Sequence, residues 1–190
     1  MSMRNTATKC GSVSKTFHWL VVVLLVIQGI LGLTMGDFAR DTRMELTTLH
    51  KSIGVTILMV VILRLLWTLY SRRPAFAPGV TPLERNLAIT VEVLLYVLMF
   101  AVPIAGWLMS DYGGRPVSWF GVFNLPQLVA ENHDLHEVWE HRHEQLFWVL
   151  VLLATGHAGM AIYHQVVQRD DTLSRMMPKG WLRNPSGKKD

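Results

Sequence analysis

Eight histidines are present in this sequence of 190 residues, and four of them, discussed below, stand at the ends of long apolar runs. One run, HEQLFWVLVLLATGH, has His143 and His157 at its two ends. A histidine in apolar surroundings needs a partner, and neutral imidazole is a common ligand of metals and haem iron. On a helix, fourteen positions put both rings within about 40° of one face and about 21 Å apart along the axis. The stretch therefore predicts a helix that presents two ligands at two heights.

Four apolar stretches are long enough to form that helix and its neighbours. A helix needs about 20 mostly apolar residues to cross a bilayer, and 51% of this chain is hydrophobic. The predicted spans cover residues 17–35, 50–70, 87–109 and 143–165, followed by a tail over 166–190. No cleavage site typical of a signal peptide follows the first span, so we expect it to be retained. The sequence predicts an all-α fold, an integral membrane four-helix bundle that forms a single domain over residues 1–190.

The distribution of positive charge predicts the orientation of the bundle. Lys and Arg are concentrated in both tails and between spans 2 and 3, whereas the other two connections are rich in Asp and Glu. Because cytoplasmic segments carry an excess of Lys and Arg, both termini are expected in the cytoplasm of a bacterium. The acidic connections then face the periplasm. The net charge of +4 reflects this bias and does not indicate a nucleic-acid partner.

With this topology the four histidines form two pairs. His18 and His157 fall toward the cytoplasmic side, and His50 and His143 toward the periplasmic side, each pair from two different helices. Cofactor sites in helical bundles are built from side chains on facing helices, and histidine is an axial ligand of haem. A single histidine at a helix end is more often an interfacial hydrogen-bonding residue. Four histidines that match in pairs at two depths favour two haems, with all four histidines as ligands.

Glycines share faces with these histidines. Gly29 and Gly32 lie eleven and fourteen positions after His18, and Gly54 lies one turn after His50. They could leave room for a porphyrin, or they could be ordinary contacts between membrane helices.

Two basic residues are further candidates for binding the cofactor. Arg64 lies fourteen positions after His50 and could pair with a haem propionate or a quinone oxygen, or it could extend to the membrane interface. Lys51 could pair with a propionate at the periplasmic level. The single Cys10 can form neither an internal disulfide nor a metal site.

Seven segments also resemble a known family, in the family's order along the chain. They are FHWL (17–20), LHKSIG (49–54), ILRLLW (62–67), LLYVLMFAVPIAGW (94–107), GRPVSWFGVFNLP (114–126), GHAGMAIYH (156–164) and DDTLSRMMP (170–178). Over residues 16–178 the chain is similar to the bacterial cytochrome b561 family of four-helix dihaem membrane cytochromes. The resemblance implies two haem b groups, with His18, His50, His143 and His157 at the ligand positions. It also implies electron exchange with ubiquinone or another quinone.

The connection after span 3 carries two further expectations. Its segment at 114–126 resembles a subgroup often found beside a periplasmic lipocalin-like partner. Residues 117–129 are apolar and aromatic but broken by Pro126, so we expect a short interfacial segment that caps the outer haem. His133, His136 and His141 follow, match no metal-site template and are expected at the surface.

Two residues are candidates for a quinone and proton site. Family members commonly carry a histidine four positions before the tyrosine of span 3, and here that position is Glu92. Glu92 could handle protons near a cytoplasmic quinone, but a carboxylate paired with an arginine such as Arg85 is the favoured interpretation. His164, seven positions after His157, could hydrogen-bond a quinone carbonyl, or it could be an exposed residue at the helix end.

Three functions remain open from the sequence. The first is a dihaem cytochrome that links a periplasmic donor or acceptor, such as a soluble redox partner, to quinone, with superoxide oxidation as one activity in this class. The predicted outer connections carry four Lys/Arg against eight Asp/Glu, which disfavours an anionic substrate. The second is a haem-binding anchor subunit of a larger hydrogenase-like or formate-dehydrogenase-like enzyme. The third is a haem-free bundle. The direction of electron flow is left open, and a homodimer is compatible with each.

Overall fold

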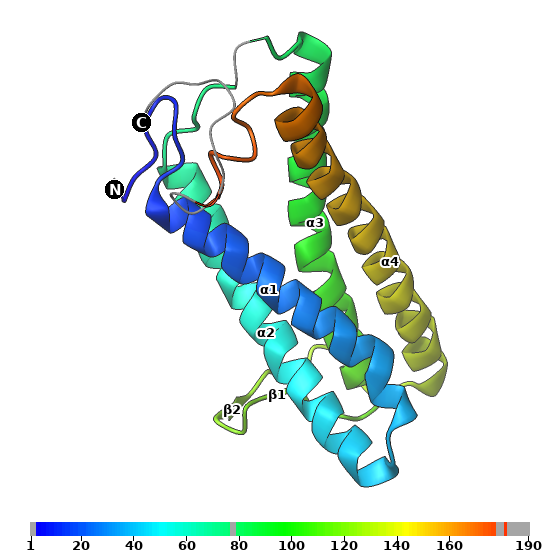
Figure 1. Cartoon of the computed structure of the whole chain (residues 1–190). Helices are drawn as coiled ribbons and strands as arrows, with labels where there is room; N and C mark the ends of the chain where they lie inside the picture. The colour runs from blue at the N-terminus through cyan, green and yellow to red at the C-terminus, as the bar shows by residue number, and fades with distance from the viewer. Residues whose placement is uncertain (1–2, 77–78, 178–180, 182–190) are drawn as a thin grey trace. The chain divides into compact units, whose positions relative to one another are not determined.

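The computed structural model describes residues 3–76, 79–177 and 181, and long helices dominate it (Figure 1). They are α1 (Ser12–Thr34), α2 (Arg40–Tyr70), α3 (Pro82–Tyr112) and α4 (His133–Tyr163). A 3-10 turn, η1 (Met35–Asp37), follows α1, and a π-helix, η2 (His164–Gln168), continues α4. Within the described residues, four helices are long and apolar enough to cross a membrane. The predicted all-α class with four spans is therefore confirmed.

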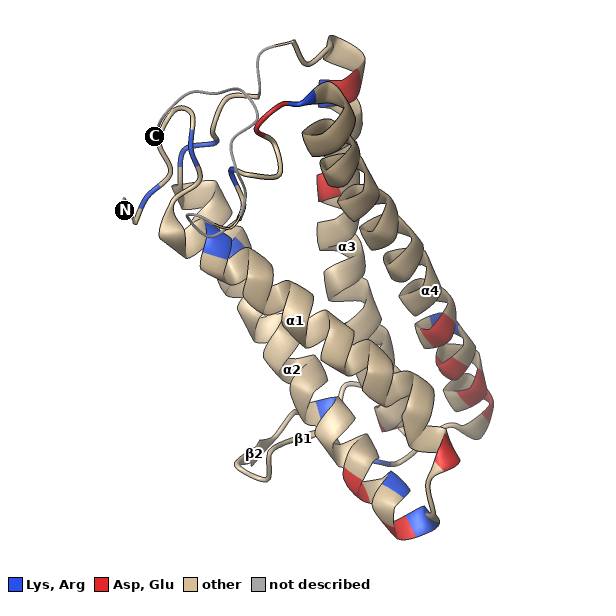
Figure 2. Cartoon of the chain, viewed as in Figure 1, with Lys and Arg blue, Asp and Glu red and all other residues tan. Residues whose placement is uncertain are grey.

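The helices continue beyond the predicted spans. Helix α2 begins at Arg40 and α4 at His133, each ten residues before the predicted span at 50 and 143. Charged side chains gather in these first turns, and α4 carries none after Glu144 (Figure 2). Apolar composition reports the thickness of the bilayer core, whereas helical hydrogen bonding continues into water. The bilayer boundaries themselves stay a prediction.

Apolar side chains cover the outside of the helices. Eight apolar side chains are buried among the described residues, whereas Leu69 of α2 and Leu152 of α4 are each 76% exposed. So much exposed apolar surface is unusual for a protein in water, but it is the surface that lipid tails require.

The chain divides into two compact units. The terminal unit comprises the described parts of 1–19, 63–95 and 151–190, and the hairpin unit comprises 20–62 and 96–150. His18 and His157 belong to the terminal unit, and His50 and His143 to the hairpin unit. A single domain over residues 1–190 stays a prediction.

The hairpin unit contains a short β-hairpin in the connection predicted to be an interfacial segment. Strand β1 (Ser118–Trp119) pairs antiparallel with β2 (Phe123–Asn124). Phe120 and Gly121 in the turn have positive φ angles of 47° and 73°. A glycine adopts this conformation readily, whereas a phenylalanine does so at a cost and needs support from its surroundings.

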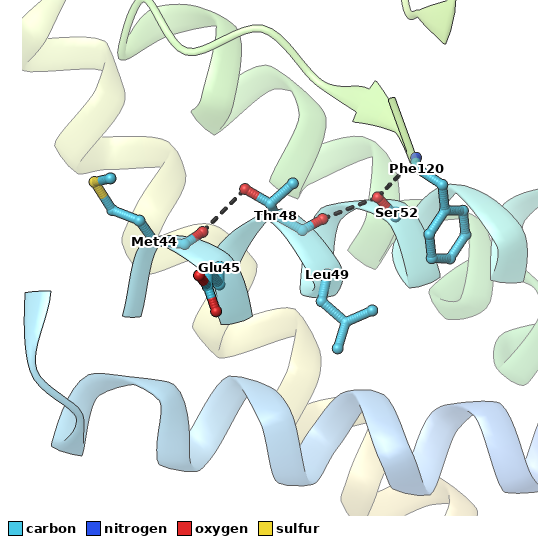
Figure 3. Close-up of a pocket in the computed structure, with 6 residues that line it drawn as sticks. All are labelled: Met44, Glu45, Thr48, Leu49, Ser52 and Phe120. Carbon is cyan, nitrogen blue, oxygen red and sulfur yellow. Dashed lines mark hydrogen bonds between the residues drawn. The ribbon is translucent and has the colours of Figure 1, made fainter. Parts of the chain in front are cut away.

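That support comes from helix α2. The buried Ser52 hydroxyl accepts from the amide of Phe120 at 3.1 Å. Its proton is shared between two carbonyls, that of Ser118 at 3.1 Å and that of Thr48, one turn earlier in α2, at 2.9 Å. Figure 3 shows Ser52 and Phe120 joined in this way. The Trp119 indole donates to the Thr56 hydroxyl at 3.1 Å. The predicted interfacial segment is thus a hairpin fastened to α2, and its place relative to a bilayer or a haem stays a prediction.

The terminal unit holds the start of the C-terminal tail against α1. The Trp19 indole donates to the Met176 carbonyl, and the Lys15 ammonium to the Met177 carbonyl, each at 2.9 Å. Arg175 donates to the carbonyl of Ala75 at 2.7 Å. The rest of the predicted tail, residues 178–180 and 182–190, lies outside the described residues.

Candidate functional site

The predicted cytoplasmic pair is brought together inside the terminal unit. The ring centroids of His18 on α1 and His157 on α4 are 6.4 Å apart, with ring planes at 59°. Trp19 packs edge-on against His18 at 5.4 Å. We call His18 and His157 the terminal pair.

Arg64 contacts the terminal pair directly. Its guanidinium lies 3.2 Å from Nδ1 of His18. Because a guanidinium can only donate, Nδ1 is the acceptor here and Nε2 carries the proton. A metal bound through Nε2 requires the opposite tautomer. Ligation of a haem through Nε2 of His18 would therefore release Arg64 from Nδ1, which fits its predicted role as the partner of a propionate or a quinone.

The predicted periplasmic pair is brought together inside the hairpin unit. The ring centroids of His50 on α2 and His143 on α4 are 6.2 Å apart, with planes at 82°. Both side chains are half-buried. We call His50 and His143 the hairpin pair.

His143 is held by helix α3 in one defined tautomer. Its Nδ1 lies 2.9 Å from the carbonyl oxygen of Val102, so Nδ1 carries the proton and Nε2 is left as a ligand. The ring reaches this carbonyl by passing over Gly106, one turn later, where a Cβ would meet ring atoms at 3.0 and 3.1 Å. Gly106 and Val102 are site residues that the sequence did not reveal.

The same arrangement recurs seven residues away on both helices. Nδ1 of His136 lies 2.7 Å from the carbonyl of Met109, and a Cβ at Gly113 would come within 2.9 Å of this nitrogen. His136 is half-buried, so its predicted surface position is wrong. The exposed positions of His133 and His141 are as predicted, and no group of three metal-ligating side chains occurs among the residues that the structure describes.

His50 rests on a glycine in a similar manner. A Cβ at Gly32 would lie 3.2 Å from Cε1 of His50, so the missing side chain makes room for the imidazole itself. Nδ1 of His50 is buried and has no hydrogen-bond partner among the residues that the structure describes. A buried imidazole nitrogen without a partner is costly, which points to a group that the protein alone does not supply.

The two pairs fit a bis-histidine haem site. A bond between imidazole nitrogen and a metal is about 2 Å long, so two imidazoles on opposite sides of one metal have centroids about 6 Å apart. The terminal and hairpin pairs, at 6.4 and 6.2 Å, both meet this requirement. In each case the two histidines come from different helices.

The remaining predicted packing residues have protein neighbours. A Cβ at Gly29 would meet the Phe147 ring at 3.4 Å, and one at Gly54 would meet the Gln28 amide at 3.4 Å. Gln28 also donates to the backbone carbonyl of His50 at 2.8 Å, so it supports the backbone of α2 at this member of the hairpin pair. A haem-packing role for Gly29, Gly32 and Gly54 stays a prediction.

Lys51 lies beside the hairpin pair in sequence and is half-buried. Its ammonium donates to the carbonyl of Arg115 at 3.3 Å. A cavity of about 440 Å³ nearby is lined by Met44, Glu45, Thr48, Leu49, Ser52 and Phe120 (Figure 3). None of the four paired histidines lines this cavity, so we assign it no part in the site.

Glu92 is paired with an arginine, but not with the predicted one. The Glu92 carboxylate accepts from Arg73, whereas Arg85 lies over the Phe76 ring at 5.6 Å. The favoured interpretation, a carboxylate paired with an arginine, is therefore confirmed, with Arg73 as the partner in place of Arg85. Glu92 and Arg64 both act electrostatically on His157, so these two charges belong to the surroundings of the terminal pair.

His164 has a carboxylate partner that the sequence did not reveal. Its Nδ1 lies 2.6 Å from Oδ2 of Asp170, and both side chains are largely buried. The residue is therefore not the exposed helix end that was one of its two interpretations. Asp170 opens the DDTLSRMMP segment, and only the turn of the chain after η2 brings it back to His164.

Comparison with known proteins gives one consistent result. The model of the family described as prokaryotic cytochrome b561 matches residues 9–179. Cytochrome b561 homolog 2 of Escherichia coli (strain K12) is 35% identical over 181 residues, covering 94% of this chain and 96% of that protein. Cytochrome b561 homolog 1 of the same strain is 26% identical, covering 85% and 93%. A protein of Yersinia pestis named probable superoxide oxidase CybB is 30% identical, covering 85% and 92%.

Proposed function

Because the chain belongs to the prokaryotic cytochrome b561 family of membrane electron-transfer cytochromes, we propose that it carries two haem b groups and links a periplasmic redox partner to the quinone pool. The family and its four membrane-crossing helices make it a multi-pass protein of a bacterial inner membrane. The observation that carries the proposal is the pairing of histidines from different helices, with ring centroids 6.4 and 6.2 Å apart.

The protein supplies ligands and surroundings for the haem. Haem b provides reversible one-electron chemistry at its iron, and the chain sets its position and polarity. In this proposal His18 and His157 hold one haem, and His50 and His143 the other. The Val102 carbonyl keeps Nε2 of His143 free to bind. Lys51, which follows His50 in sequence, neutralises a haem propionate. Arg64 lies beside the terminal pair and either neutralises a propionate or donates a hydrogen bond to a quinone oxygen.

The quinone reacts at the terminal unit. His164 and Glu92 are the ionisable groups that could exchange protons there, with Arg64 as a positive charge. Glu92 is already paired with Arg73, so His164 is the stronger candidate. Quinone chemistry couples electrons to protons, and histidine is the side chain that exchanges protons most readily near neutral pH.

Superoxide is one candidate for the electron donor. A relative is named probable superoxide oxidase, which supports this donor. The excess of Asp and Glu in the predicted outer connections opposes attraction of an anion unless Lys51 and Arg115 form a local positive patch. The lipocalin-like partner and the homodimer stay predictions.

The experiment that tests this function is the haem-to-protein ratio of the detergent-purified chain, with oxidised and reduced visible spectra. We expect two haems in the wild-type protein and one in His157→Ala and in His143→Ala. His133→Ala is the matched control, because this side chain is exposed and pairs with the exposed Glu137 one turn later, so the variant should keep two haems. One haem in the wild-type protein would contradict one of the pairs. Co-purification of a large redox subunit would favour the anchor-subunit alternative.

A further inference from the structure

The end of α4 folds back to place a carboxylate on an imidazole. The π-helix η2 begins at His164, and Arg169 after it adopts a left-handed conformation with φ 53°. The amide of Asp170 then returns to the carbonyl of His164 at 3.1 Å. π-Helical turns and left-handed non-glycine residues are uncommon and cluster at functional sites. Here they bring Oδ2 of Asp170 within 2.6 Å of Nδ1 of His164.

The carboxylate is held in place and charged. The side chains of His164 and Asp170 are 12% and 14% exposed. Partial burial opposes ionisation of Asp170, but hydrogen bonds from Thr172 and His164 outweigh it and lower the pKa of this carboxyl. An ionised carboxylate only accepts, so Nδ1 of His164 must be the donor. Nε2 of His164 is thereby directed away from Asp170 and left for another group.

Other charged side chains near His164 and Asp170 have partners of their own. Glu84 of α3 acts electrostatically on His164 and accepts hydrogen bonds from Thr81 and from Gln168. In the C-terminal segment, Asp171 pairs with Arg175 at 2.9 Å. Asp170 is thus the carboxylate in contact with His164, while its neighbour Asp171 serves the fold of the segment.

We propose that Asp170 is a positioning residue for proton exchange with quinone: it fixes His164 with Nε2 toward the quinone oxygen and places a negative charge beside the ring that transfers the proton. This inference rests on the proposed quinone reaction at His164. Reduction of a quinone to a quinol takes up two electrons, supplied through haem b, and two protons. One proton passes from Nε2 of the His164 imidazolium to one quinone oxygen, and His164 then regains a proton from water. The second proton reaches the other quinone oxygen from water. Quinol oxidation uses the same steps in reverse.

The test compares Asp170→Asn with Asp171→Asn in the purified holoprotein. The rate of haem oxidation by a short-chain ubiquinone is measured from pH 5 to pH 10. Asp170→Asn removes the negative charge beside the protonated His164 ring, so the ring should lose its proton at lower pH. The alkaline limb of the rate profile should therefore move to lower pH by about one unit. Asp171→Asn should keep the wild-type profile, although it loses the Arg175 ion pair.

A second measurement does not depend on activity. Nitrogen NMR of histidine-labelled protein, with the low-spin haem reduced and diamagnetic, reports which ring nitrogen of His164 carries the proton. We expect Nδ1–H in the wild-type protein at alkaline pH and a mixture of tautomers in Asp170→Ala. The His164 resonances are assigned by their loss in His164→Gln.

Failure of the inference and failure of the proposed function give different results. If His164→Gln leaves the quinone rate unchanged, the quinone site at His164 is wrong and the inference fails with it. If His164→Gln slows the reaction but Asp170→Asn keeps the wild-type profile, only the role of Asp170 is overturned. Equal loss of rate in Asp170→Asn and Asp171→Asn without a shift in pH would also overturn it, since both would then act on the fold.

Discussion

At the scale of single residues, the site depends on how each imidazole uses its second nitrogen. A ligating histidine donates its other N–H to an oxygen, which fixes the ring and its tautomer. His143 does so to Val102 because Gly106 lets the ring approach the backbone of α3. The ring of His50 lies against Gly32, and within the described part of the chain its Nδ1 has no acceptor. The glycines that matter most are therefore those under the histidine rings.

Gly106→Ala should weaken the proposed binding of haem by the hairpin pair. The new Cβ would lie 3.0 Å from the His143 ring, so the ring must move away from the Val102 carbonyl. Loss of such a supporting hydrogen bond typically lowers metal affinity about 10–100-fold. Haem content and the reduced spectrum after dilution measure this effect. Gly159→Ala on α4 is the control, because a Cβ at this position meets open space, and it should match the wild-type protein. Equal haem retention in the two variants would count against the role of Gly106.

At the scale of elements, one hydroxyl fastens the β-hairpin to α2. Ser52 is buried and serves the hairpin twice, at the Ser118 carbonyl and the Phe120 amide. The left-handed Phe120 is held by this anchor, because its own amide donates to the Ser52 hydroxyl.

Ser52→Ala should loosen the hairpin. It leaves the Phe120 amide without its acceptor, which costs about 1–3 kcal/mol for a buried group. Hydrogen exchange of the amide of Leu125, which donates to the Val117 carbonyl, should become about 10–100-fold faster. Thr48→Ala is the control, because its hydroxyl donates to the Met44 carbonyl within α2 and to no part of the hairpin among the described residues. Unchanged exchange in Ser52→Ala would show that other contacts hold the hairpin.

At the scale of the whole molecule, the bilayer takes the place of an apolar core. Side chains such as Leu69 and Leu152 are largely exposed and would be unfavourable in water. Charge then decides the orientation, since Lys and Arg are retained on the cytoplasmic side.

Labelling of introduced cysteines tests this orientation. In a Cys10→Ser background, a membrane-impermeant maleimide should label Val122→Cys in intact spheroplasts, and Arg85→Cys only after the membrane is opened. Both positions are exposed in the structure and lie outside the predicted spans, so the side of the membrane should decide their access to the reagent. Labelling of Arg85→Cys in intact spheroplasts would reverse the topology. Native Cys10 should react slowly, because burial raises the pKa of its thiol more than Lys15 and Arg175 lower it.

The amino-acid sequence was enough to predict the four membrane helices and the pairing of His18 with His157 and of His50 with His143. Both follow from local rules: apolar length, the helical repeat and the distribution of Lys and Arg. The groups that meet the second nitrogens of these rings depended on the folded structure. Val102 offers a backbone carbonyl, which no side-chain pattern reveals, and Asp170 reaches His164 through a π-helix and a left-handed residue. The partner of Glu92 also depended on tertiary contacts, since Arg73 lies nineteen positions away and Arg85 lies over the Phe76 ring. Contacts of this kind depend on how chain segments meet in space, which the helical repeat of one segment does not determine.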